Sequence, residues 1–150
     1  YDRGEALLAN SIAIVFLTLG CIFWGWLADR IGSYRVLLIG ALALAASSYV
    51  FYHALPADVL HTTALYSLTG FALGSVAVVP MILVGLFPPA VRYSGFSFSY
   101  NVAYSIFGGF TPILIALWLK VDTLAPAHYL AMVCAVAFML SFWLGRNHRL

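Results

Sequence analysis

GWLADRIGSYR, at residues 25–35, is a short polar stretch between two long apolar runs, and it decides how the rest of the chain is interpreted. We expect one membrane-spanning helix to end at Ala28 and another to begin at Val36, so that residues 29–35 make the turn. Gly25 would let two helices approach closely, and Gly32 would adopt a positive φ in the turn. Asp29 would cap or face the N-terminus of a helix. The stretch therefore predicts a tight polar hairpin between two membrane spans.

Composition places the whole chain in a lipid bilayer. Hydrophobic residues make up 64% of the 150 residues, charged residues only 8%, and the mean hydropathy is +1.01. A soluble domain has about 25% charged residues, so we expect an integral membrane protein. The formal net charge of +2 is too small to indicate a nucleic-acid partner.

Five apolar segments without any Asp, Glu, Lys or Arg follow one another along the chain. Most of them approach or exceed the ~20 residues that a helix needs to cross the hydrocarbon core, and only a helix satisfies its own backbone there. We therefore predict an all-α integral membrane fold in which residues 1–150 form one partial transmembrane bundle. The expected spans are residues 6–28, 36–55, 64–87, 95–119 and 129–145.

Basic residues are distributed unequally between the two ends of these spans. One end has Arg30, Arg35, Arg92, Arg146 and Arg149, and the other has Arg3 and Lys120. Because Lys and Arg accumulate on the cytoplasmic side, we expect a multi-pass membrane protein with a cytoplasmic C-terminus. An odd number of spans with an outside N-terminus predicts further spans upstream.

Small residues recur at a spacing of four in the spans, as in Gly70 and Gly74, and plain helix packing is their expected role. Cys21 and Cys134 lie in apolar runs and are interpreted as small buried side chains rather than a disulfide or metal pair. The histidines have no metal spacing, so no metal or cofactor is expected. No nucleophile–base pair, paired carboxylates or phosphate loop occurs, so we do not expect an enzyme.

The fourth span has the most polar face of the five. Ser97, Asn101, Tyr104, Gly108 and Thr111 follow one another at spacings of four, three, four and three, so they share one side of a helix, with Tyr100 beside them. Pro112 cannot donate a backbone hydrogen bond and, with Gly108-Gly109, is expected to loosen the helix. Interrupted helices are where transporters commonly bind substrate. The alternative is a hydrogen-bonded seam between helices. The candidate substrate-binding residues are Ser97, Tyr100, Asn101, Tyr104 and Thr111.

Two motifs together resemble the metabolite:proton symporter branch of the major facilitator superfamily. The first is G-x-L-A-D-R-x-G at residues 25–32, and the second is F-P-x-x-V-R-Y-S-G, S-Y-N and G-G-x-x-P between residues 87 and 112. The resemblance covers nearly the whole chain. It implies spans eight to twelve of a twelve-span bacterial inner-membrane carrier, that is, five helices of its C-terminal six-helix bundle.

The resemblance implies secondary active transport: proton-coupled symport of a small organic acid or zwitterion by alternating access, with the missing N-terminal half as partner. It also implies that the loop residues Gly25, Asp29, Arg30, Gly32, Arg35 and Arg92 control the conformational change. Asp29 would face the start of the fourth span, near residues 94–95, and stabilise the outward-open state; alternatively, it only fixes the loop.

The chain departs from the family pattern at three positions. Ser33 and Tyr34 replace basic residues, and Gly85 stands where a glutamate is frequent. No span contains an acid, so a proton-carrying carboxylate must lie elsewhere in the carrier, or coupling is absent. Two alternatives therefore stay open: an uncoupled facilitator, and a membrane-embedded accessory or assembly subunit.

Overall fold

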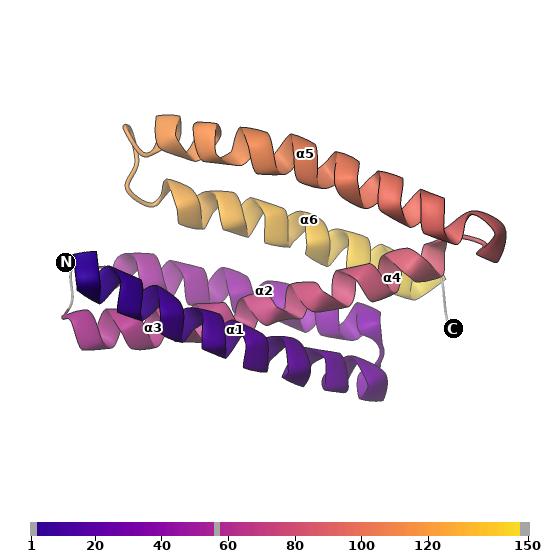
Figure 1. Cartoon of the computed structure of the whole chain (residues 1–150), viewed down its shortest axis with the longest axis horizontal. Coiled ribbons are helices and arrows are strands. Elements are labelled where there is room, and N and C mark those ends of the chain that lie inside the picture. Colours follow the sequence, from indigo (N-terminus) through magenta and orange to yellow (C-terminus); the bar gives the residue numbers. More distant parts are fainter. Residues whose placement is uncertain (1–2, 56–57, 148–150) are drawn as a thin grey trace.

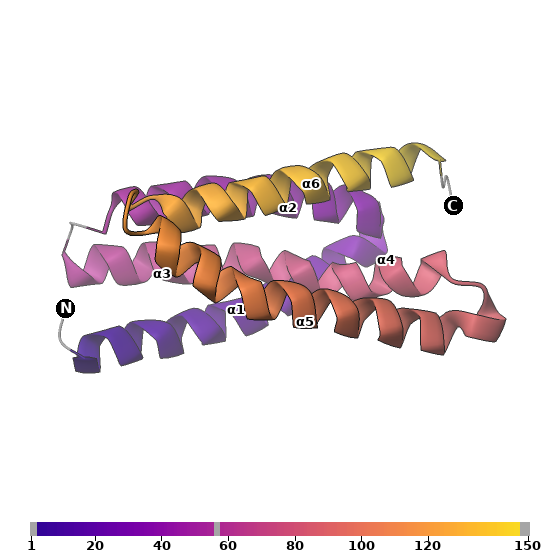
Figure 2. The same ribbon diagram turned by 90° about the horizontal axis from the view of Figure 1, so that it is seen from above.

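Every long apolar run of the sequence is helical in the computed structural model, which describes residues 3–55 and 58–147. Figures 1 and 2 show long helices lying side by side, with the N-terminus and the C-terminus at opposite ends. No strand occurs in these two ranges. The elements are α1 (Arg3–Ile31), α2 (Ser33–His53), α3 (Val59–Leu73), the 3₁₀ helix η1 (Gly74–Ala77), α4 (Val78–Leu86), the 3₁₀ helix η2 (Pro89–Val91), α5 (Arg92–Trp118) and α6 (Ala125–Asn147).

Five helical stretches of the described chain are long and apolar enough to cross a membrane, as the sequence predicts. They are Arg3–Ile31, Ser33–His53, Val59–Leu86, Pro89–Trp118 and Ala125–Arg146. Each begins several residues before the expected span, because the helical hydrogen bonds continue into the polar flanks, where a charge is tolerated near the membrane surface.

The turn between the first two spans is shorter than expected. Only Gly32 separates α1 from α2, so the predicted turn over residues 29–35 is wrong. Gly32 adopts φ 92°, which confirms the predicted positive φ. Asp29 and Arg30 belong to the last turn of α1, where the positive charge of Arg30 is favourable beside the helix C-terminus.

The third span is broken near its middle. The 3₁₀ helix η1 separates α3 from α4, and Pro80 follows the break in the first turn of α4. Because Pro80 has no N–H to donate to the carbonyl four residues earlier, an α-helical bond is missing there. The tighter winding of η1 lies just before that gap.

Glycines let α1 and the third span meet backbone to backbone. A Cβ added at Gly70 would lie 2.7 Å from the Ala13 carbonyl oxygen, and one added at Gly74 would lie 2.5 Å from the Gly20 carbonyl carbon. Both distances are too short for a real side chain, so the GxxxG pair is a packing seam, as predicted. Beside this seam, Trp24 Nε1 donates a hydrogen bond of 2.9 Å to a carbonyl of the third span.

The helices α2 and α6 form the second closely packed pair. A buried cluster of Ala41, Leu44, Ala72 and Cys134 joins them to the third span. Cys134 is buried, Cys21 is half-buried, and both are free thiols, in agreement with their predicted role as packing side chains.

Charges separate the two ends of the bundle. Figure 1 shows the α1–α2 turn, the α4–α5 connection and the end of α6 at one end of the bundle. This is the basic end, because these segments contain Arg30, Arg35, Arg92 and Arg146. The opposite end contains Arg3, Lys120 and every described acid except Asp29. Arg149 and His148, which the sequence analysis also considered, lie outside the described residues.

Candidate functional site

A pocket of about 710 Å³ lies where α5 meets the third span and α6. α5 supplies most of the wall, with residues that recur every three or four positions, as the period of a helix requires. Opposite them lie Val76 and Pro80, at the break of the third span, and Tyr129 from α6. The break therefore forms part of the pocket wall.

Three of the five predicted substrate-binding residues line this pocket, namely Tyr100, Tyr104 and Thr111. Ser97 and Asn101 are not part of its lining. The side-chain amide of Asn101 donates a hydrogen bond of 2.7 Å to the Ser97 carbonyl, so it is satisfied within its own helix. The structure thus divides the predicted polar face between the pocket and an exposed side of α5.

α5 is continuous where the sequence analysis expected it to loosen. Arg92–Trp118 is one α-helix with Pro112 inside it. The expected interruption at Gly108-Gly109 is therefore wrong. The absent hydrogen bond of one proline does not end the helix, because the bonds of the neighbouring turns remain. The interruption lies instead in the facing third span.

Tyr129 is a pocket residue that sequence reasoning did not select. Its hydroxyl lies 2.6 Å from Thr111 Oγ1, and within the described ranges this is the one side-chain hydrogen bond from α5 to another membrane span. A tyrosine at the start of a span is typical of the aromatic belt at the membrane surface. No spacing in the sequence links it to Thr111.

Aromatic rings form a column along α5. The ring centroids of Phe96 and Tyr100 are 5.4 Å apart, and those of Tyr100 and Tyr104 are 4.8 Å apart. Phe107 also lines the pocket. Aromatic faces attract alkylated cations, and tyrosine and threonine hydroxyls donate hydrogen bonds to carboxylates. The wall can therefore contact both ends of a small zwitterion.

No charged side chain belongs to the pocket lining in the described part of the chain. A carboxylate taken out of water without a partner is costly, so an organic acid would need a positive charge from elsewhere. A zwitterion has its own counter-charge. The lining is therefore better suited to a zwitterion than to an acid.

Of the two glycines predicted to act in conformational change, the structure gives a special role to one. Gly32 makes the turn, as described above. Nothing lies within 4 Å of a Cβ added at Gly25, so the close helix approach expected there is wrong. That approach occurs one helical turn and more away, at Gly20.

The charged residues predicted to act in conformational change lie at the basic end without meeting one another. The Arg30 guanidinium lies 4.8 Å from the centroid of the Trp26 ring, and Arg92 Nε donates a hydrogen bond of 3.2 Å to the Phe87 carbonyl. Asp29 is exposed.

The described parts of α1 and α5 do not contact each other. The expected approach of Asp29 to the start of α5 is therefore absent from this conformation. Arg35 is also exposed, at the start of α2.

His128 joins three segments at the opposite end. Its Nδ1 lies 2.7 Å from the Tyr49 hydroxyl, its Nε2 lies 3.3 Å from Asp122 Oδ2, and its ring centroid is 6.3 Å from that of Trp118. Because a carboxylate only accepts, we place the ring proton on Nε2, so that Nδ1 of a neutral ring accepts from Tyr49. The contacts tie the ends of α2, α5 and α6 together. In the described residues, no group of three or more His, Cys, Asp or Glu side chains is placed to hold a metal ion.

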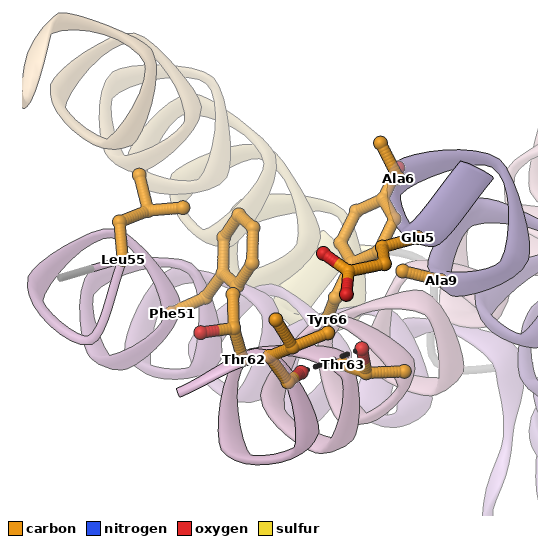
Figure 3. A pocket seen from close by; sticks show the side chains of 9 residues that line it. Glu5, Ala6, Ala9, Phe51, Leu55, Thr62, Thr63 and Tyr66 are labelled. Atoms are coloured by element: carbon orange, nitrogen blue, oxygen red, sulfur yellow. Dashed lines mark hydrogen bonds between the residues drawn. The ribbon is translucent and has the colours of Figure 1, made fainter. Parts of the chain in front are cut away.

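A second, smaller pocket of about 170 Å³ lies between α1, α2 and α3 at the opposite end. Figure 3 shows the Glu5 carboxylate beside the rings of Phe51 and Tyr66, whose centroids are 5.1 Å apart. Tyr66 also donates a hydrogen bond of 3.1 Å to Asn10 Oδ1. The surrounding wall is otherwise made of aliphatic and threonine side chains.

Comparison with known proteins gives a consistent result. The family model described as "MFS/sugar transport protein" matches residues 2–87. The chain is 33% identical over 140 residues to a putative proline/betaine transporter of Staphylococcus aureus strain COL, covering 90% of this chain and 30% of that protein.

Two further relatives are transporters, one named for shikimate and the other for ectoine and proline. The shikimate transporter of Escherichia coli strain K12 is 31% identical over 139 residues, covering 89% of this chain and 31% of that protein. The ectoine/proline transporter of Corynebacterium glutamicum is 32% identical over 134 residues, covering 83% of this chain and 25% of that protein. The chain thus spans about 30% of the length of the Staphylococcus aureus relative. No solved structure matches the chain.

Proposed function

The chain belongs to the major facilitator superfamily of transport proteins, and we propose that it is part of a secondary active transporter for a small zwitterion or organic acid. In this proposal it supplies spans eight to twelve of a twelve-span carrier, and an N-terminal half completes the transport path. Because the family and the relatives are transport proteins, the expectation that the chain is not an enzyme agrees with them.

One observation carries the proposal: the pocket between α5, the third span and α6 combines hydroxyl groups with an aromatic wall. The hydroxyls of Thr111 and Tyr129 would bind the carboxylate of the substrate, and the rings of Tyr100 and Tyr104 would lie against its cationic group. The relatives are named for proline, betaine, ectoine and shikimate. The uncharged lining favours the zwitterions in this set.

We further propose that transport is proton-coupled symport by alternating access in a bacterial inner membrane, with the basic end in the cytoplasm. Because no acid lines the pocket among the residues that the structure describes, the proton-carrying group would belong to the rest of the carrier. An uncoupled facilitator is the second candidate, and the same uncharged lining favours it. Family membership favours either carrier over the accessory subunit.

Uptake by proteoliposomes that contain the complete carrier tests the proposal. We expect uptake of glycine betaine or proline to exceed that of shikimate, and to rise when the outside is made acidic. Collapse of the proton gradient should then abolish accumulation. Uptake that only equilibrates, and that ignores the gradient, would identify the facilitator; no uptake of any of the three would contradict the substrate class.

A further inference from the structure

A groove of about 200 Å³ between α2 and α6 lies at the basic end, and each helix contributes one arginine to it. Arg35 lies in the first turn of α2, and Arg146 lies in the last turn of α6. Both side chains are exposed, and neither forms an ion pair with a described acid. Two positive charges that share one groove repel each other, so an anion between them would be stabilised.

The remainder of the groove is apolar. Leu38 and Phe142 form its sides, and the Arg146 guanidinium lies 5.8 Å from the centroid of the Phe142 ring. The Ser141 hydroxyl donates a hydrogen bond to the Tyr34 carbonyl, which joins the two helices beside the groove. The groove therefore combines two charged side chains with an apolar surface.

The position of the groove along the helices indicates which kind of anion would fit it. The groove lies where two candidate membrane spans end, which in a bilayer would be the depth of the lipid headgroups. Basic pockets between membrane helices bind anionic lipid headgroups. Asp29 is the one described acid at the basic end, and it lies on α1, outside the groove. The groove thus offers a phosphate two guanidinium groups and no competing carboxylate of its own.

We propose that Arg35 and Arg146 bind the phosphate of an anionic phospholipid, whose acyl chain lies along Leu38 and Phe142. The planar guanidinium groups match phosphate oxygens with paired hydrogen bonds. The apolar sides supply the contact that separates a lipid from a free phosphate ion. This site does not depend on the proposed transport function.

Native mass spectrometry of the complete carrier, released from phosphatidylcholine vesicles that contain phosphatidylglycerol, tests the proposal through the dissociation constant of bound phosphatidylglycerol. We expect Arg35→Gln and Arg146→Gln each to raise this constant about fivefold, since one basic residue near an anionic surface contributes about that factor. The double Gln variant should show the combined loss. The double Lys variant keeps both charges but loses the paired hydrogen bonds of the guanidinium groups, so its binding should lie between that of the wild type and that of the double Gln variant.

Arg30→Gln is the matched control, because it removes one positive charge from the same end while its guanidinium lies over Trp26 and outside the groove. Its dissociation constant should stay within about twofold of the wild type, because Arg30 is not among the lining residues and salt weakens the effect of an exposed charge that does not contact the ligand. An equal effect of all three Gln variants would mean general surface charge and would overturn the site. So would an unchanged double Gln variant with a native melting temperature. Displacement of the lipid by millimolar inorganic phosphate would assign the arginines to the free ion instead, which also overturns the proposal.

Discussion

The helices α1 and α5 differ in how they pack. α1 packs closely against α3, whereas α5 stays largely exposed along its length. α1 is the more apolar span, with a mean hydropathy of 2.3 in its best window, and it meets the third span along a glycine seam. α5 has a mean hydropathy of 1.4, yet none of its residues is buried. If lipid alone surrounded the bundle, the less apolar helix α5 would be the more buried one, because exposed polar groups are costly in a bilayer.

This difference shows that glycines and polar residues in a membrane helix indicate two different kinds of surface. Gly20, Gly70 and Gly74 form a seam inside the bundle, because association in lipid depends on close packing rather than on hydrophobicity. Polar residues on α5 indicate a surface that something other than lipid would cover in a bilayer. In the proposed carrier that cover is substrate, water and the second half of the protein. Four predictions test the comparison, beginning with the largest effect.

Gly74→Leu should break the glycine seam. The new side chain would meet the Gly20 backbone, which cannot move as a flexible side chain can. Overpacking of this kind typically costs about 1–3 kcal/mol and occasionally more, and we expect the upper end. The unfolding free energy in mixed micelles would measure it. A loss below about 0.5 kcal/mol would show that α1 and the third span are not in contact in the bilayer.

Asp29→Asn tests whether the basic end takes part in transport although it is remote from the pocket. If Asp29 approaches the start of α5 in the outward-open state, the lost interaction with the helix dipole is about 1–2 kcal/mol. The inward–outward balance would then shift roughly tenfold. We expect the maximal uptake rate to fall by about that factor while KM changes little. An unchanged maximal rate would contradict this role and would mean that Asp29 only fixes the conformation of the loop.

Thr111→Val and Tyr129→Phe remove the hydrogen bond that joins α5 to α6. Each should weaken substrate binding about three- to tenfold, the range expected for one hydrogen bond. Because the two hydroxyls act as a pair, the double variant should lose less than the product of the single losses. Ser105→Ala, which removes an exposed hydroxyl of α5 outside the pocket lining, is the control. Fully independent losses would argue against a shared role at the substrate.

Gly109→Ala should have the smallest effect and the opposite sign. Nothing lies within 4 Å of a Cβ added at Gly109, so the gain in helix propensity, at most about 1 kcal/mol, is not offset by a clash. Unfolding in the same micelles would compare it with Gly74→Leu. A clear destabilisation would reveal a neighbour of α5 that covers Gly109 in the complete carrier.

The two glycines of the polar hairpin explain why part of the site escaped sequence analysis. Gly32 was predictable, because a positive φ is a local property of a turn. Gly25 was not, because whether a small residue meets a partner depends on a helix far away in the sequence. The same holds for Thr111 and Tyr129, which lie 18 residues apart on two helices. The helical period placed Tyr100 and Tyr104 near each other but could not show that Asn101 lies outside the pocket lining.

The local chemistry of the chain was sufficient to set the membrane environment, the five spans and the accumulation of arginines at one end. These features follow from bilayer thickness and from the cost of unpaired charge in lipid, and both act on each segment separately. Three features became visible only in the assembled helices. They are the pairing of α1 with α3 and of α2 with α6, the break at Gly74–Ala77 beside the pocket, and the groove between Arg35 and Arg146. Lipid gives no preference for one helix face over another, so shape complementarity between distant segments chooses the partners.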